Sequence, residues 1–247
     1  MNTPQNIYDD PCFFEGYSRL RENPQNYNAL LEQPALWSLL PDLHGKAVLD
    51  MGCGFGDACQ EYARLGATSV VGIDISEKML SVARTRNSSE PIEYLQLDMM
   101  SIPTLGRRFD VVTSSLAVHY VEDFHRLVEI VGGCLNPGGV FLFSQEHPLT
   151  TAPVQGVSFQ KEPDGRSSAY LLSDYGRPGF RSVKWFVDDV EKYHRMFSEI
   201  LNTLIRSGFI IEAMQEPLPD DALLQRCPRM YREYIKPSFL LVRAKKG

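Results

Sequence analysis

The residues with the clearest chemical potential form the segment DMGCGFGD at positions 50–57, which follows a short apolar run. Its glycines, Gly52, Gly54 and Gly56, allow a tight turn and let a ligand approach the backbone closely. Its two carboxylates, Asp50 and Asp57, flank this turn and would repel a pyrophosphate group. The segment therefore predicts a binding site for a small ligand that carries positive charge.

The surrounding pattern predicts the elements that position this segment. Residues 47–49 form an apolar run too short for a helix, which indicates a buried parallel strand, and residues 57–65 continue at helical spacing. A strand, a glycine turn and a helix make the first unit of a nucleotide-binding α/β fold, with the helix N-terminus facing the ligand. A dinucleotide site would place its third glycine at position 57, where this chain has Asp57.

A second acid follows at the end of the next predicted strand, residues 69–74. Asp74 lies 18 residues after Gly56, close to the spacing at which an acid receives ribose hydroxyls. A carboxylate can accept hydrogen bonds from both hydroxyls at once. Ser76 then caps a helix that carries Met79. An acid at the end of a strand can also serve only to cap the following helix, which is the alternative for Asp74.

The rest of the chain continues the alternation of strands and helices. Apolar periodicity predicts a helix over residues 124–134, and a capping box of Asp188 and Glu191 predicts another over residues 188–206. Further strands are predicted at residues 92–99, 109–116, 140–144, 209–213 and 237–244, with weaker strand signals at 167–172 and 182–187.

Several of these motifs resemble the class I S-adenosylmethionine-dependent methyltransferases. Residues 50–56 resemble the family's first motif, in which an acid ends a strand and Gly-x-Gly-x-Gly follows; residues 114–117 and the Leu-x-Pro-Gly-Gly turn at 135–139 resemble later motifs. The resemblance covers about residues 40–147 and is greatest to the small-molecule branch called type 11. It implies an α/β, Rossmann-like fold with a seven-stranded, mostly parallel sheet in the order 3-2-1-4-5-7-6. Helices would cover both faces, and a lid would be inserted after strand 5.

The resemblance also implies a cofactor, S-adenosylmethionine, with S-adenosylhomocysteine as its product. The sulfonium and ammonium groups of this cofactor suit the acids of the glycine turn, and no metal is expected. Asp98 and Met99 map to adenine recognition, although Asp98 could instead be a turn residue. The implied cofactor-binding residues are Tyr17, Asp50, Gly52, Cys53, Gly54, Asp74, Ile75, Met79, Asp98, Met99 and Ser115.

Two histidines are candidates for acid–base catalysis on the methyl acceptor, because the pKa of histidine suits proton transfer near neutral pH. His147 follows the fifth predicted strand beside Glu146, and a plain hydrogen-bonding role is its alternative. His119 follows the fourth strand, and packing around its loop is the alternative.

Three arginines are weaker candidates for binding carboxylates. Arg19 and Arg21, near Tyr17, could reach the methionine carboxylate of the cofactor, and Arg195 could bind a carboxylate of the acceptor. For each of them a solvated surface position is the alternative reading.

The predicted organisation has three parts. Residues 1–44 form an N-terminal helical cap, residues 45–148 and 188–247 form the methyltransferase core, and residues 149–187 form a lid that selects the acceptor. The lid is rich in aromatic residues, which either line an acceptor pocket or form a small core of their own.

Composition narrows the functional class. The chain has 247 residues, 43% of them hydrophobic, and a formal net charge of −6, without the clustered cations that nucleic-acid binding needs. Its five cysteines are odd in number and lack metal-ligand spacing, which favours reduced thiols in a cytoplasmic protein. The N-terminus predicts no signal peptide, and no apolar run is long enough for a membrane span.

Together these features predict methyl transfer to a small-molecule oxygen or nitrogen acceptor by in-line displacement. The expected partners are that acceptor, with no nucleic acid and no membrane, and the expected state is a monomer or a homodimer. Three alternatives remain: a non-catalytic S-adenosylmethionine-binding regulatory or partner protein, a nucleic-acid methyltransferase and an NAD-dependent oxidoreductase.

Overall fold

The computed structural model of the chain describes residues 5–155 and 159–247. Residues 1–4 belong to the stretch expected to contain no signal peptide, and residues 156–158 belong to the predicted lid. These parts of the two expectations lie outside the described residues.

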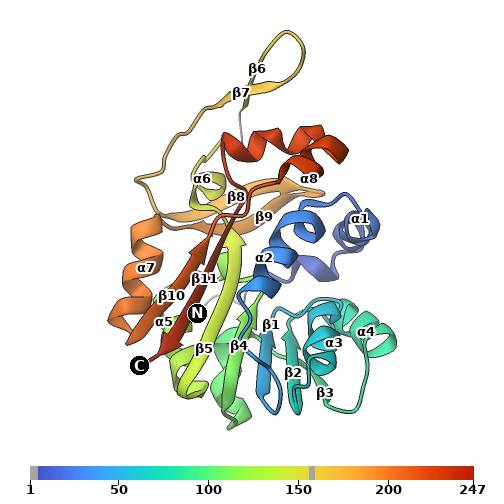
Figure 1. The fold of residues 1–247 in the computed structure, drawn as a ribbon, viewed down its shortest axis with the longest axis vertical. Helices are drawn as coiled ribbons and strands as arrows, with labels where there is room; N and C mark the ends of the chain where they lie inside the picture. Colours follow the sequence, from blue (N-terminus) through green and yellow to red (C-terminus); the bar gives the residue numbers. More distant parts are fainter. Residues whose placement is uncertain (1–4, 156–158) are drawn as a thin grey trace.

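Seven strands form the central sheet. They are β1 (Ala47–Met51), β2 (Ser69–Asp74), β3 (Ile92–Gln96), β4 (Phe109–Ser114), β5 (Leu135–Glu146), β10 (Phe209–Gln215) and β11 (Phe239–Lys246). Their order is β3-β2-β1-β4-β5-β11-β10 (Figure 1). Strands β1 to β5 are parallel, whereas β11 runs antiparallel to both β5 and β10. The predicted fold is therefore confirmed, with β10 and β11 as its sixth and seventh strands.

One face of the sheet is covered by α5 (Phe124–Cys134), α7 (Phe197–Arg206) and the short helix η3 (Met99–Leu105). Alternate side chains of the strands, such as Leu49 and Phe141, pack against the apolar stripe of α5. Burial on both faces explains why β1 and β2 read as continuous apolar runs.

The opposite face is covered in two parts. Helices α3 (Asp57–Arg64) and α4 (Glu77–Arg86) cover β1, β2 and β4, with Tyr62 and Leu80 fully buried. Over β5 and β11 lie η2 (Asn28–Glu32), α2 (Gln33–Ser38), α8 (Asp221–Arg226) and η5 (Pro228–Tyr234). Within the described ranges, no helix has both the length and the apolar content needed to cross a membrane.

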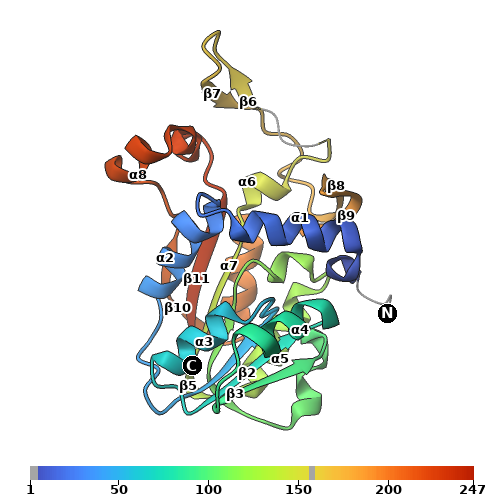
Figure 2. The same ribbon diagram turned by 90° about the vertical axis from the view of Figure 1, so that its right-hand side faces the viewer.

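The remaining elements lie beyond the carboxyl ends of the parallel strands (Figures 1 and 2). They are η1 (Ile7–Asp9), α1 (Pro11–Glu22), η4 (Val118–Tyr120), α6 (Pro148–Thr151), β6 (Phe159–Lys161), β7 (Ser167–Tyr170), β8 (Gly179–Trp185) and β9 (Val187–His194). Helix α1 crosses this end of the molecule, and the β6–β7 hairpin projects away from it in both views.

The predicted helix over residues 188–206 is wrong in its first half. Residues 187–194 form β9, which pairs antiparallel with β8, and α7 begins only at Phe197. Val190, Lys192 and His194 are buried on one side of β9, so burial repeats every two residues, as in a strand. Pairing with β8 therefore overrides the helix-start signal of the capping box. The β8–β9 hairpin therefore spans the predicted boundary between lid and core.

Two strand boundaries also differ from the prediction. The third strand ends at Gln96, because Asp98 caps η3 by accepting a hydrogen bond from the N–H of Met100 at 2.9 Å. The fifth strand begins at Leu135, because the predicted turn at residues 135–139 already pairs with β4 through a register shift.

Candidate functional site

A cavity of about 1810 Å³ opens at the carboxyl ends of β1, β2 and β4. This edge is the place where open α/β sheets bind their ligands. All of the residues that the sequence assigns to the cofactor line the cavity: Tyr17, Asp50, Gly52, Cys53, Gly54, Asp74, Ile75, Met79, Asp98, Met99 and Ser115. The fold therefore brings together side chains that lie up to about a hundred residues apart in sequence.

The three glycines of the turn are needed for different reasons. Gly52, Gly54 and Gly56 have φ values of +70°, +54° and +79°, a conformation that other residues rarely adopt. A Cβ on Gly52 would lie 2.6 Å from the Cβ of Ala117, and one on Gly56 would lie 2.3 Å from the hydroxyl of Tyr94. A Cβ on Gly54 would meet no atom within 4 Å, and Gly54 lines the cavity. The turn thus presents bare backbone to a ligand at Gly54.

Two carboxylates, buried Asp50 and half-buried Asp74, hold the base of this turn. Asp74 accepts hydrogen bonds from the N–H of Gly54 and from the N–H of Ser76, both at 2.9 Å. Asp50 accepts from the hydroxyl of Thr113 at 2.9 Å. Burial raises the pKa of each carboxyl to about 6, although these hydrogen bonds favour the charged form. Since a pKa of about 6 lies below neutral pH, both carboxyls are mostly ionised there and give this end of the cavity negative charge.

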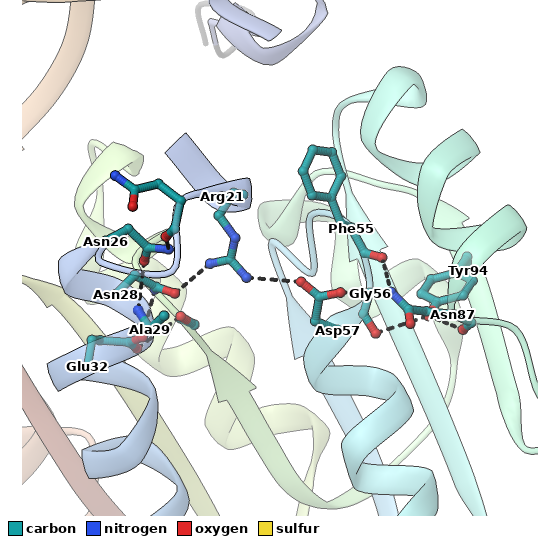
Figure 3. Close-up of polar contacts among 12 residues, drawn as sticks. Arg21, Asn26, Asn28, Ala29, Glu32, Phe55, Gly56, Asp57, Asn87 and Tyr94 are labelled. Atoms are coloured by element: carbon teal, nitrogen blue, oxygen red, sulfur yellow. Dashed lines mark hydrogen bonds and ion pairs between the residues drawn. The ribbon is translucent and has the colours of Figure 1, made fainter. Parts of the chain in front are cut away.

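Arg21 connects the N-terminal cap to the glycine turn. Its guanidinium donates to Oδ1 of Asn28 at 2.5 Å and to Oδ2 of Asp57 at 3.0 Å, and Figure 3 shows it between these two groups. Tyr17 lies one turn earlier on the same helix, whereas Arg19 is exposed and pairs with Glu15. Of the two arginines considered from the sequence, the structure brings Arg21 to the cavity.

Asn87 holds the other side of the turn. Its Nδ2 donates to the carbonyl of Phe55 at 2.8 Å and to Oδ1 of Asp57 at 2.9 Å, and its own carbonyl accepts from the hydroxyl of Tyr94 at 2.7 Å (Figure 3). Asp57 is therefore fixed between Arg21 and Asn87.

Glu32 is a buried residue behind the cavity wall that the sequence analysis missed. Its side chain is fully buried and accepts from the hydroxyls of Ser115 (2.9 Å) and Ser144 and from Nδ2 of Asn28 (2.8 Å). Burial raises the pKa of this carboxyl above its usual value. The sequence does show one acid, Glu32, within the largely apolar stretch at residues 30–36, and this could have marked it as a buried carboxylate. Glu32 joins the cap to the ends of β4 and β5.

His147 does not lie in the cavity lining. Its Nδ1 accepts from the N–H of Leu149 at 3.1 Å, where it caps α6, and its Nε2 lies 2.7 Å from Oε1 of Glu216. Both ring nitrogens therefore have local partners, which matches the hydrogen-bonding alternative considered for this residue. We do not propose His147 as the catalytic base.

His119 does line the cavity, and it is almost completely buried at 2% exposure. Burial lowers its pKa to about 3, so the imidazole is neutral at physiological pH. A group with so low a pKa is a weak general base. From its position in the cavity lining, the neutral imidazole could instead form a hydrogen bond with a ligand.

Arg195 fixes the loop that carries His119. Its guanidinium donates to the carbonyls of Val121 and Glu122, the latter at 3.1 Å, and lies 5.1 Å from the ring centre of Phe124. Only 4% of the residue is exposed, and burial lowers its pKa to about 10. Arg195 thus joins the end of β9 to the loop after β4 and also lines the cavity, so the solvated position considered from the sequence is wrong.

We expect the substitution Arg195→Met to lower the free energy of unfolding by about 2–4 kcal/mol, because it removes a buried guanidinium that donates to the carbonyls of Val121 and Glu122 and packs on Phe124. Chemical denaturation would measure this loss. The matched variant Arg84→Met removes an exposed pair with Glu77 and should cost less than about 1 kcal/mol. Similar losses in both variants would contradict the proposed role of Arg195.

Comparisons with known proteins point in the same direction as this geometry. The family model described as "Methyltransferase domain" matches residues 49–143. An uncharacterized protein of Haemophilus influenzae is 38% identical over 256 residues, covering 100% of this chain and 99% of that protein.

Two solved structures are similar over most of the chain. An S-adenosylmethionine dependent methyltransferase from Mesorhizobium loti has a TM-score of 0.80 and 38% identity, covering 92% of this chain and 100% of that one. A proposed S-adenosylmethionine dependent methyltransferase from Listeria monocytogenes has a TM-score of 0.81 and 36% identity, covering 87% of this chain and 96% of that one.

Proposed function

The chain belongs to the S-adenosylmethionine-dependent methyltransferases, and from this premise we propose that it transfers the cofactor's methyl group to a small-molecule oxygen or nitrogen acceptor. One observation carries the proposal. The glycine turn, with its open backbone at Gly54, shares one continuous cavity with a polar end formed by His119 and Glu146. The cavity thus has room and suitable chemistry for a cofactor and an acceptor together.

The donor set of the cavity fits this cofactor. Asp74 would accept the ribose hydroxyls, since each of its oxygens has a lone pair beyond the backbone bond that it already accepts. Asp98 and Met99, at the start of η3, would receive the adenine. Arg21 would pair with the carboxylate of the methionine portion, and Asp50 gives the negative charge that favours its ammonium and sulfonium.

S-adenosylmethionine supplies a methyl group on a sulfonium, which is already a good leaving group. The protein then has to align the acceptor with the methyl carbon and exclude bulk water, and such alignment can contribute about 7–11 kcal/mol. In such a transfer the acceptor's lone pair would form the new bond as the carbon–sulfur bond breaks, the electron pair would stay on sulfur, and the acceptor's proton would be released to solvent. Gly52 and Ala117 pack closely enough to fix the loop after β4 against the glycine turn for this alignment.

A transfer assay tests the proposal. The full-length protein would be incubated with S-adenosylmethionine labelled at its methyl group, together with a metabolite extract, purified RNA or a mixed protein sample. We expect label in the small-molecule fraction, and loss of this label for the Asp74→Ala variant. Label in RNA or protein would overturn the small-molecule assignment. Cofactor binding without transfer to any fraction would favour the non-catalytic alternative.

A further inference from the structure

The loop after β4 connects the glycine turn to a second group of polar side chains in the cavity. These are Tyr8, His119, Tyr120 and Glu146, which we call the polar patch. At one end of the loop, Ala117 packs against Gly52; at the other, His119 and Tyr120 form part of η4. Just before Ala117, Leu116 has a φ of +52°, a strained conformation held by hydrogen bonds from its N–H to the hydroxyl (3.0 Å) and carbonyl (3.1 Å) of Ser144. The patch is therefore only a few residues from the cofactor end of the cavity.

Glu146 is the charged member of the patch. Its Oε1 accepts from Nζ of Lys192 at 2.6 Å, and the side chain of Glu146 is 23% exposed while that of Lys192 is 8% exposed. The carboxylate therefore faces the cavity with the ammonium behind it, over the ring of Trp185. Burial alone would raise the pKa of Glu146, but Lys192, His119 and Lys236 hold it at about 2.

Among the described residues, the patch includes one polar atom of Glu146 and one of His119 that have no hydrogen-bond partner. Across residues 5–155 and 159–247, Oε2 of Glu146 receives no hydrogen bond, and Nδ1 of His119 is a buried atom without one. Because the Glu146 side chain is partly exposed and lines the cavity, its free oxygen is open to a hydrogen-bond donor from a ligand. Tyr8 and Tyr120 complete the patch, with their hydroxyls 3.2 Å apart. A ligand that donates an N–H or O–H group would pair with the free oxygen of Glu146.

We propose that the polar patch binds the reacting group of the methyl acceptor, and that this group is an amine or a hydroxyl and not a carboxylate. Glu146 is the residue that sets this specificity. An N–H or O–H donor can pair with its free oxygen, whereas a carboxylate would face a like charge there. This inference rests on the proposed function and names the acceptor class for the same site.

Sinefungin tests the inference without knowledge of the natural acceptor. In this analogue a carbon bearing an amine replaces the methylated sulfur, so N–H donors lie where the methyl group would be. Calorimetry would compare its affinity with that of S-adenosylhomocysteine for the full-length wild type. We expect wild type to bind sinefungin at least about 10-fold more tightly, because a charge-assisted hydrogen bond to Glu146 is added.

The variants isolate the contribution of Glu146. Glu146→Gln should reduce the sinefungin preference about 10-fold while S-adenosylhomocysteine affinity stays within about two-fold. Glu199→Gln is the matched control, since Glu199 also lines the cavity, outside the patch, and should keep the preference. Should Glu146→Gln fail to fold, Glu146→Asp keeps the charge beside Lys192 but withdraws it from the cavity, and it should also lose the preference.

The outcomes separate the two proposals. No sinefungin preference in wild type, or a preference that both Glu146 variants keep, would overturn the assignment of the patch and leave cofactor binding intact. Failure of folded wild type to bind either compound would instead overturn the proposed function.

Discussion

Replacing Asp74 by alanine is expected to lower the affinity for S-adenosylmethionine at least about 100-fold. Two ribose hydroxyls donating to an ionised carboxylate contribute about 1.5–3 kcal/mol each, and their joint loss exceeds two orders of magnitude in Kd. The substitution also frees the N–H of Gly54, which Asp74 holds at 2.9 Å, so the glycine turn loses an anchor. Titration calorimetry on the folded variant would measure the change.

Asp110 offers a matched control for this experiment. Its carboxylate has the same kind of structural role at the opposite end of the sheet, accepting from the N–H of Ala47 at 3.0 Å and from Asn136 at 2.9 Å. Asp110→Ala should lower the free energy of unfolding by about 1–3 kcal/mol and leave cofactor affinity unchanged. Equal affinity losses in the two variants would show that general destabilisation, and not a ribose contact, explains the effect of Asp74→Ala.

The second large effect is expected at the glycine turn, where folding and binding can be separated. Gly54→Ala should cost only about 1–2 kcal/mol of stability, because its φ is left-handed but the space around a new Cβ is open. The same methyl group would project into the cavity where the backbone meets the cofactor, so affinity should fall at least about 10-fold, more than the lost stability alone explains.

Two other glycines bracket this prediction. Gly45 has a comparable φ of +73° and equally open space but lies outside the cavity lining. Gly45→Ala should therefore lose similar stability and no cofactor affinity. Gly52→Ala would add a 2.6 Å collision with Ala117 and should cost about 2–5 kcal/mol in total. Denaturation and calorimetry on the three variants would check this order. Wild-type affinity in Gly54→Ala would mean that the turn does not contact the cofactor.

The site residues that the sequence predicted can each be recognised from a few neighbouring residues in the chain. Asp50, Asp74 and Asp98 each follow a short apolar run, and the glycines follow Asp50 directly. A parallel sheet then brings the ends of its strands to one edge, so local signals become a common site once the strand order is known. The structure places all three acids in one cavity on this account.

The parts that were missed depend on contacts between distant segments. The sequence left His147 open between acid–base catalysis and plain hydrogen bonding, because its partner Glu216 lies 69 residues later in the chain. Glu32 and Tyr8 are positioned by hydrogen bonds with Ser115 and Tyr120, which lie far along the chain. The first half of the predicted helix over residues 188–206 failed for the same reason, since pairing with β8 determines the conformation of residues 187–194.

The most direct test of the account is titration calorimetry of the full-length protein with S-adenosylmethionine and, separately, with NAD. Asp57 at the start of α3, together with the cavity-lining acids Asp50 and Asp74, favours a cationic ligand over a pyrophosphate. We predict saturable binding of S-adenosylmethionine at one site per chain and no binding of NAD. Binding of NAD, or of neither compound by the folded protein, would contradict the assignment of this cavity to S-adenosylmethionine.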